Sequence, residues 1–110
     1  MKRRFSLTRS ARQDLQSIDG YHVREYGVPA ADRLLNRIVE AIERYAEWPM
    51  SAPARPELAS DLRGFNVASY MVYYAPQARS GIRVERIIHG ARDQAALFTR
   101  HRQRKARERA

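Results

Sequence analysis

Few residues of this chain have the types and spacings that a catalytic or metal site requires. The sequence contains no cysteine, which excludes a thiol nucleophile, a disulfide framework and a thiolate metal site. The histidines, His22, His89 and His101, show neither HxxxH nor HExxH spacing, so a zinc enzyme is not expected. Asp14 and Asp19 show no sign of a shared pocket and are expected on the solvated face of a helix. With only scattered glycines and no phosphate-binding loop, the sequence predicts no metal and no cofactor.

Two short segments are better candidates for a functional surface. One is Leu-Arg-Gly-Phe around Arg63, and the other is His-Gly-Ala-Arg-Asp, which begins at His89. Each has a structural interpretation beside a binding one. Arg63 would pair with Glu57 or Asp61, project to solvent, or bind a partner, and His89 would either fix the turn that follows it or belong to a binding surface.

Positive charge is the strongest feature of the composition. The chain has 21 basic and 12 acidic residues, for a net charge of +9. Residues 99–110 contain six basic residues and one acid, so they carry +5 and leave +4 for residues 1–98. Arginine outnumbers lysine nineteen to two, and although a GC-rich genome explains that excess equally well, guanidinium suits carboxylate and phosphate. The expected partner is acidic, either nucleic acid or a negatively charged protein.

Length and hydropathy predict one soluble globular domain. The 110 residues are 44% hydrophobic and 30% charged, which is ordinary for a chain that buries a single core. No apolar run approaches the roughly 18 residues of a membrane span, and the N-terminal MKRRF leads into polar residues instead of a signal-peptide core. A cytoplasmic protein is the expectation.

A strand and two helices are predicted in the first half. Residues 4–7 alternate as in a strand, and Thr8 and Ser10 both have N-cap chemistry for a helix that ends before Gly27. A second helix follows about three residues later, and its apolar residues recur every three or four positions. Trp48-Pro49 ends this helix. Tyr45 and Trp48 continue its apolar stripe and are expected in the core.

Three strands are predicted in the second half, at residues 62–67, 70–74 and 82–89. The second is aromatic and β-branched, which is typical of a central strand, and the third loses its alternation near Glu85, where a bulge or an edge position is expected. The order β-α-α-β-β-β predicts an α+β fold, with an antiparallel helix hairpin on one face of a mainly antiparallel sheet. Residues 1–98 form the predicted domain, residues 93–98 a last helical turn, and residues 99–110 a flexible basic tail.

The motifs in residues 3–98 resemble the ParE branch of the ParE/RelE toxin superfamily. The family's Leu-Thr-x-x-Ala-x-x-Asp-Leu-x-x-Ile motif is matched by residues 7–18. Further matches follow in the family's order: Ala-Ala-Asp-Arg at 30–33, Trp-Pro at 48–49, Arg-Pro-Glu-Leu at 55–58, Leu-Arg-x-Phe at 62–65, a Tyr-x-Val-x-Tyr strand at 70–74 and His-Gly-Ala-Arg-Asp at 89–93.

This resemblance implies a toxin of a type II toxin–antitoxin system that a ParD-like antitoxin holds inactive. ParE toxins trap DNA gyrase on broken DNA and so block replication, which needs binding and no catalytic residue. The candidate contacts with gyrase or antitoxin are the basic residues of the last strands and the tail: Arg63, Arg83, Arg86, His89, Arg92, Arg100, Arg102, Arg104 and Lys105.

Two alternatives remain open. A RelE-like toxin cuts ribosome-bound messenger RNA, which requires cations around the reacting phosphate and a proton-transfer group. The residues available for that chemistry are Arg63, Arg86, His89 and Arg92, with Tyr73 or Tyr74 as proton donor. The other alternative is a DNA-binding accessory protein whose tail contacts phosphates.

Overall fold

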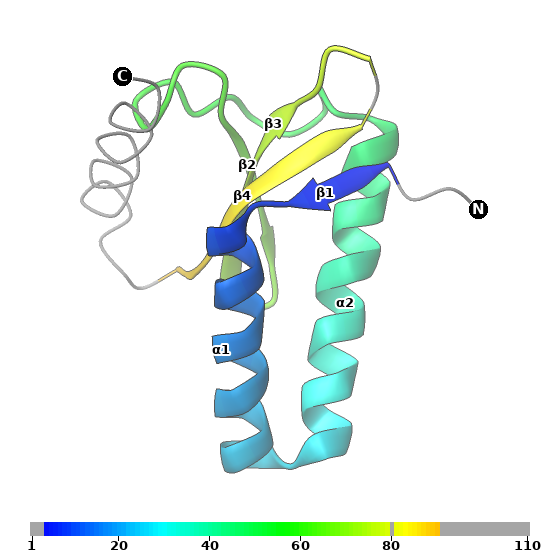
Figure 1. Cartoon of the computed structure of the whole chain (residues 1–110), viewed down its shortest axis with the longest axis vertical. Helices are drawn as coiled ribbons and strands as arrows, with labels where there is room; N and C mark the ends of the chain where they lie inside the picture. Colours follow the sequence, from blue (N-terminus) through cyan, green and yellow to red (C-terminus); the bar gives the residue numbers. More distant parts are fainter. Residues whose placement is uncertain (1–3, 80, 91–110) are drawn as a thin grey trace.

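The structure is a computed structural model that describes residues 4–79 and 81–90. It contains the predicted order of elements: β1 (Phe5–Leu7), α1 (Arg9–Tyr26), α2 (Val28–Glu47), β2 (Arg63–Val67), β3 (Tyr70–Pro76) and β4 (Ile82–His89). In Figure 1, α1 and α2 form an antiparallel hairpin whose connecting end extends past the sheet. The predicted helical turn at 93–98 and the tail lie outside the described residues.

The four strands form one mixed sheet in the order β1-β4-β3-β2. The β1 strand pairs parallel with β4, and the other two pairs are antiparallel, which confirms the mainly antiparallel sheet and the central position of β3. Tyr73 lies opposite Arg86 while Tyr74 lies opposite Val84, so Glu85 is the extra residue of a bulge. The bulge was one of two expectations for this strand, and the edge position was wrong because β4 lies between β1 and β3.

The start of β4 requires glycine. Gly81 has a φ of +80°, and a Cβ there would lie 1.9 Å from the Arg4 carbonyl oxygen. That oxygen accepts a hydrogen bond from the Ile82 N–H at 2.9 Å. A side chain at Gly81 would therefore separate the first residues of the two parallel strands.

The helix boundaries follow from the residues at their ends. The Thr8 hydroxyl accepts from the Ala11 N–H at 3.0 Å and caps α1, whereas Ser10 lies inside the helix. Gly27, with φ 89° and ψ 164°, is the only residue between the two helices, so the connection is shorter than predicted. This conformation is open to glycine alone, and Pro29 lies in the first turn of α2.

Two apolar cores form on the two faces of the sheet. The larger core lies between the hairpin and the sheet and includes Ile38, Ile42 and Tyr74. On the other face, Tyr73 packs with apolar residues of the 58–62 segment and the sheet: Leu58, Leu62, Met71 and Ile88. Neighbouring tyrosines of β3 thus belong to different cores, because side chains alternate between the faces of a strand.

Trp48 corrects one prediction about the core. It does not continue the apolar stripe of α2, since 71% of its surface is exposed. The helix ends at Glu47, and the backbone of Trp48 (φ −128°, ψ 69°) leaves the helical path. Tyr45, one turn earlier, packs as predicted and stacks on Phe65 with ring centroids 4.0 Å apart. Both α1 and α2 are too polar for membrane-spanning helices.

The facing of α2 is testable by truncating its side chains. Ile38 and Ile42 are fully buried, so Ile38→Ala and Ile42→Ala should each lower the free energy of unfolding by about 2–5 kcal/mol, and Leu35→Ala, at a half-buried position, by less. Glu40→Ala and Arg44→Ala lie on the exposed face and should cost about 0.5 kcal/mol or less. Denaturant melts measure both sets, and equal losses would contradict this facing.

Candidate functional site

The start of α1 closes the edge of β4 that β1 leaves uncovered. The pairing of β1 with β4 ends at Val84. Beyond it, the Thr8 N–H donates to the Val84 carbonyl at 3.0 Å, and the Thr8 hydroxyl donates to the Glu85 carbonyl at 2.9 Å. Six residues further along the chain, the Asp14 carboxylate accepts from the Ile87 N–H at 2.9 Å. A helix start therefore takes the place of a strand along this edge.

Asp14 also holds Arg86 in a two-point ion pair. The Arg86 Nε and Nη2 atoms donate to Asp14 Oδ2 and Oδ1 at 2.8 and 3.0 Å. The two side chains are only 17% and 15% exposed, so this pair is better shielded from water than a surface salt bridge. The prediction that Asp14 lies on a solvated helix face was wrong, because the periodicity of α1 does not reveal the strand edge that runs beside it.

Arg83 forms an ion pair with Glu85 at the bulge, although the Arg83 side chain is 38% exposed. Its Nε donates to Glu85 Oε2 at 2.6 Å, and the Glu85 side chain is 4% exposed. A buried carboxylate without a cation beside it would be strongly unfavourable. Arg83 therefore neutralises the one acidic residue that the bulge turns inward.

The Leu-Arg-Gly-Phe segment also has a structural explanation. The Arg63 Nη1 atom donates to the carbonyls of Ala52 at 2.6 Å and Met50 at 3.2 Å. Neither predicted acid pairs with Arg63; Glu57 pairs with Arg55 at 2.7 Å instead. The loop after α2 is thus tied to the sheet through Arg63, and through Tyr74, whose hydroxyl donates to the Pro49 carbonyl at 2.6 Å.

Gly64 makes room for the second core. A Cβ at Gly64 would lie 2.9 Å from the Tyr73 ring, so the ring packs against β2 only because that side chain is missing. Tyr73 is fully buried, and Arg55 lies 5.7 Å from its ring centroid. Burial raises the pKa of the Tyr73 phenol above its ordinary value, so at neutral pH it is uncharged.

The residues available for RNA cleavage are divided between the two faces of the sheet. Arg63 lies opposite Tyr74 and Arg86 opposite Tyr73, and these two tyrosines belong to different cores. His89 is exposed at the end of β4, where its ring meets Tyr70 edge-on at 5.4 Å. Arg92, Arg100, Arg102, Arg104 and Lys105 lie outside the described residues.

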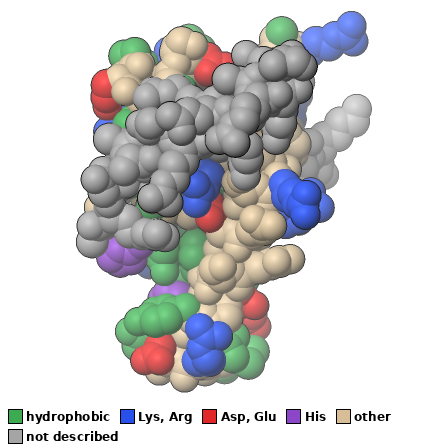
Figure 2. All heavy atoms as spheres, turned by 60° about the vertical axis from the view of Figure 1, so that its left-hand side comes forward, with side chains coloured by type: hydrophobic (Ala, Val, Ile, Leu, Met, Phe, Trp, Pro, Cys, Tyr) green, Lys and Arg blue, Asp and Glu red, His purple; other side chains and the backbone are tan. Residues whose placement is uncertain are grey.

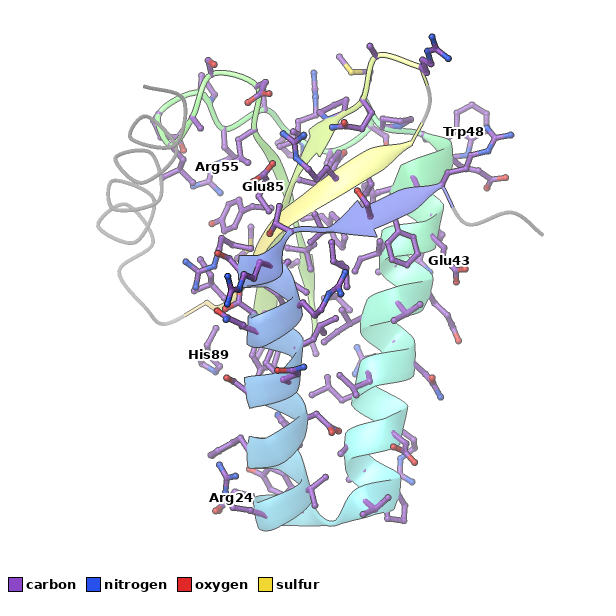
Figure 3. All side chains as sticks on the ribbon, in the orientation of Figure 1. Arg24, Glu43, Trp48, Arg55, Glu85 and His89 are labelled. Atoms are coloured by element: carbon purple, nitrogen blue, oxygen red, sulfur yellow. The ribbon has the colours of Figure 1, made fainter. Side chains whose placement is uncertain are left out.

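A cluster of aromatic rings between the hairpin and the end of β4 was not predicted as a unit. His22 on α1 shares a hydrogen bond of 3.1 Å with the Tyr70 hydroxyl on β3, and its ring lies 5.3 Å from that of Tyr26. The four-residue spacing of His22 and Tyr26 was the feature of the sequence that could have predicted this contact, because residues four apart lie on the same face of a helix. Figure 3 places Arg24 at the hairpin end of the molecule, far from Trp48 at the other end of α2.

No described group suggests a metal centre: within residues 4–79 and 81–90, no three His, Cys, Asp or Glu side chains are placed to hold an ion. The polar side chains described above form hydrogen bonds with main-chain groups or with one another. They join helix to sheet and loop to sheet, and they present no assembled set of catalytic groups in this part of the chain.

Comparisons with known proteins bear on both the fold and the family of this chain. A structure described as "Chromosomal ParDE TA system from P. aeruginosa" is 21% identical, with a TM-score of 0.67 over 77% of this chain and 92% of that one. The model of the family described as "ParE toxin of type II toxin-antitoxin system, parDE" matches residues 5–94. This protein belongs to the ParE toxin family. No curated protein matches the chain.

The joint between α1 and β4 should contribute strongly to stability. Asp14→Ala removes the acceptor of three hydrogen bonds and leaves a shielded guanidinium unpaired, so it should lower the free energy of unfolding by about 2–4 kcal/mol. Asp19→Ala, on the same helix, should change it by about 0.5 kcal/mol or less. In a double-mutant cycle, Asp14→Ala with Arg86→Ala should cost less than the sum of the single changes. Additive losses in denaturant melts would mean that the ion pair contributes nothing.

Proposed function

We propose that this ParE-family protein inhibits DNA gyrase by binding it and trapping the enzyme on broken DNA. The observation that best supports a binding mechanism is the arrangement of Arg63 and Arg86. Both arginines are held by intramolecular contacts, and they lie on opposite faces of the sheet. Phosphoryl transfer would instead need cations gathered around one reacting phosphate.

The burial of the two tyrosines also supports binding without catalysis. Tyr73 and Tyr74 are both fully buried, so neither hydroxyl is open to a substrate as the proton donor that RNA cleavage would need. The Tyr74 hydroxyl also donates a hydrogen bond to the Pro49 carbonyl at 2.6 Å. These side chains stabilise the two cores and the loop after α2.

The distribution of charge supports an acidic target. Residues 4–79 and 81–90 contain twelve arginines and ten carboxylates, which is +2, so +7 of the total +9 falls on the remaining residues. The candidates Arg92, Arg100, Arg102, Arg104 and Lys105 are among these. Such a charge attracts a gyrase–DNA complex or an acidic antitoxin over a distance of about one Debye length.

The antitoxin is expected to be ParD-like, in keeping with the parDE family match. We propose that it forms a hetero-oligomer with this protein through an amphipathic helix, with acidic residues toward the basic toxin. The short β1 strand leaves an edge of the sheet where an antitoxin strand would pair, whereas residues 53–55 already pair with the start of β2 at the other edge.

The gyrase proposal is tested with purified protein, gyrase, ATP and supercoiled plasmid. Linear DNA should appear after protease treatment, because a trapped cleavage complex releases broken ends once gyrase is digested. Tyr73→Phe should produce as much linear DNA as the wild type, since no proton transfer is involved. Absence of linear DNA, together with cut messenger RNA on ribosomes and a loss of about a hundredfold in Tyr73→Phe, would establish the ribonuclease alternative.

The basic tail should strengthen the action on gyrase. Replacing Arg100, Arg102, Arg104 and Lys105 with glutamine in the full chain removes four positive charges and should reduce the yield of linear DNA at a given toxin concentration. The reduction should be largest at low salt, where charge is least screened. Arg33→Gln with Arg37→Gln, on the exposed face of α2, is the control and should have little effect. Equal yields for all three proteins at every salt concentration would exclude a role for the tail.

A further inference from the structure

Five aromatic rings form a continuous cluster from the hairpin to the end of β4, and we call it the ring cluster. Tyr21, His22 and Tyr26 come from α1, Tyr70 from β3 and His89 from β4. Successive centroids are close throughout: 5.4 Å for Tyr21–His22, 5.3 Å for His22–Tyr26, 6.2 Å for His22–Tyr70 and 5.4 Å for Tyr70–His89. These spacings are those of interacting aromatic pairs.

The inner rings support the outer ones. Tyr70 is buried, and its hydroxyl shares a 3.1 Å hydrogen bond with His22 Nε2. The outer rings are open to solvent: 47% of Tyr21 and 63% of Tyr26 are exposed, and so is 55% of the adjoining Val28. Figure 2 shows the two described histidines on the same face as the hydrophobic side chains at the hairpin end. The exposed surface of the ring cluster is therefore apolar, and the inner rings of His22 and Tyr70 hold it in place.

Charge argues against nucleic acid as the occupant of the ring cluster. Stacking surfaces for single strands combine aromatic rings with a cationic groove along the backbone. On the same helix turns, Arg24 is accompanied by two acids, Asp19 and Glu25. Residues 19–28 therefore carry a net charge of −1, and binding to these turns depends on apolar contact.

Area argues against a second copy of the chain. A tyrosine contributes about 200 Å² of surface, so the exposed parts of Tyr21, Tyr26 and Val28 sum to about 300 Å². Two such patches would bury about 600 Å², about half of the roughly 1,200 Å² at the low end for stable interfaces. The patch suits a partner that covers it as one part of a larger contact.

We propose that the ring cluster is the place where the cognate antitoxin inserts apolar side chains. The proposal deepens the proposed function and rests on the antitoxin that membership of the ParE family implies. Aliphatic or aromatic anchors would pack on Tyr21, Tyr26 and Val28, while the tyrosine hydroxyls and His89 offer hydrogen bonds at the rim. A rigid, partly buried aromatic patch is typical of binding hot spots.

The test compares two exposed apolar patches of the full chain. The probe is the purified cognate ParD-like antitoxin, and its dissociation constant is measured by calorimetry or biolayer interferometry. Tyr21→Ser with Tyr26→Ser should weaken binding about 30-fold or more, as expected for the loss of two hot-spot side chains. The matched control is Trp48→Ser with Met50→Ser, whose side chains are 71% and 67% exposed beyond the other end of α2. It should stay within about threefold of the wild type, and both variants should keep the wild-type melting temperature.

Three results would overturn the proposal. They are unchanged antitoxin binding by the Tyr21/Tyr26 variant, a loss confined to the Trp48/Met50 control, or a wild-type dimer at micromolar concentration that only the Tyr21/Tyr26 changes dissociate. Failure of the gyrase proposal is read separately, from wild-type toxin alone in the plasmid assay. Antitoxin binding that depends on the ring cluster supports this inference whether or not linear DNA forms there.

Discussion

The fold depends on how the edge of β4 is completed where β1 stops. A three-residue strand pairs with β4 only as far as Val84, yet the main-chain groups that follow also need partners. Thr8 and Asp14 provide these partners with a hydroxyl and a carboxylate, and Thr8 caps α1 at the same time. The same residues therefore begin the helix, orient it along the sheet and hold Arg86. These roles of Thr8 and Asp14 explain the spacing of the Leu-Thr-x-x-Ala-x-x-Asp motif in residues 7–14.

A second constraint is that β3 is covered on both faces. The Glu85 bulge separates Arg86, opposite Tyr73, from Val84, opposite Tyr74, and the two tyrosines pack into different cores. The loop after α2 must then be held in place so that the 58–62 segment reaches the second core, on the face of the sheet opposite the hairpin. Arg63 and the Tyr74 hydroxyl fix it through three carbonyl groups. Arg63 therefore serves as a hydrogen-bond donor to main-chain carbonyls and not as a free cation.

Periodicity predicted the elements well because each depends on local pattern. The apolar stripe of α2 and the continuous apolar run of β3 report directly on burial, and the lost alternation near Glu85 reported the bulge. What the sequence could not reveal were contacts between distant elements. Asp14 and Arg86 are 72 residues apart, and Arg63 binds carbonyls that have no side-chain signature. Trp48 was misplaced because the apolar stripe was extended to a residue before proline, whose backbone leaves the helical path.

These contacts divide the basic residues into two sets with different physical roles. Arg63, Arg83 and Arg86 were candidates for binding, but each is held by a carboxylate or by carbonyl groups of its own chain. Moving any of them onto a partner would leave Glu85, Asp14 or the loop after α2 without its cation, at a cost to the fold. Most of the net charge lies on residues outside the described part of the chain. Under the proposed function, these basic residues would attract the acidic target, while the ring cluster would take the apolar side chains of the antitoxin.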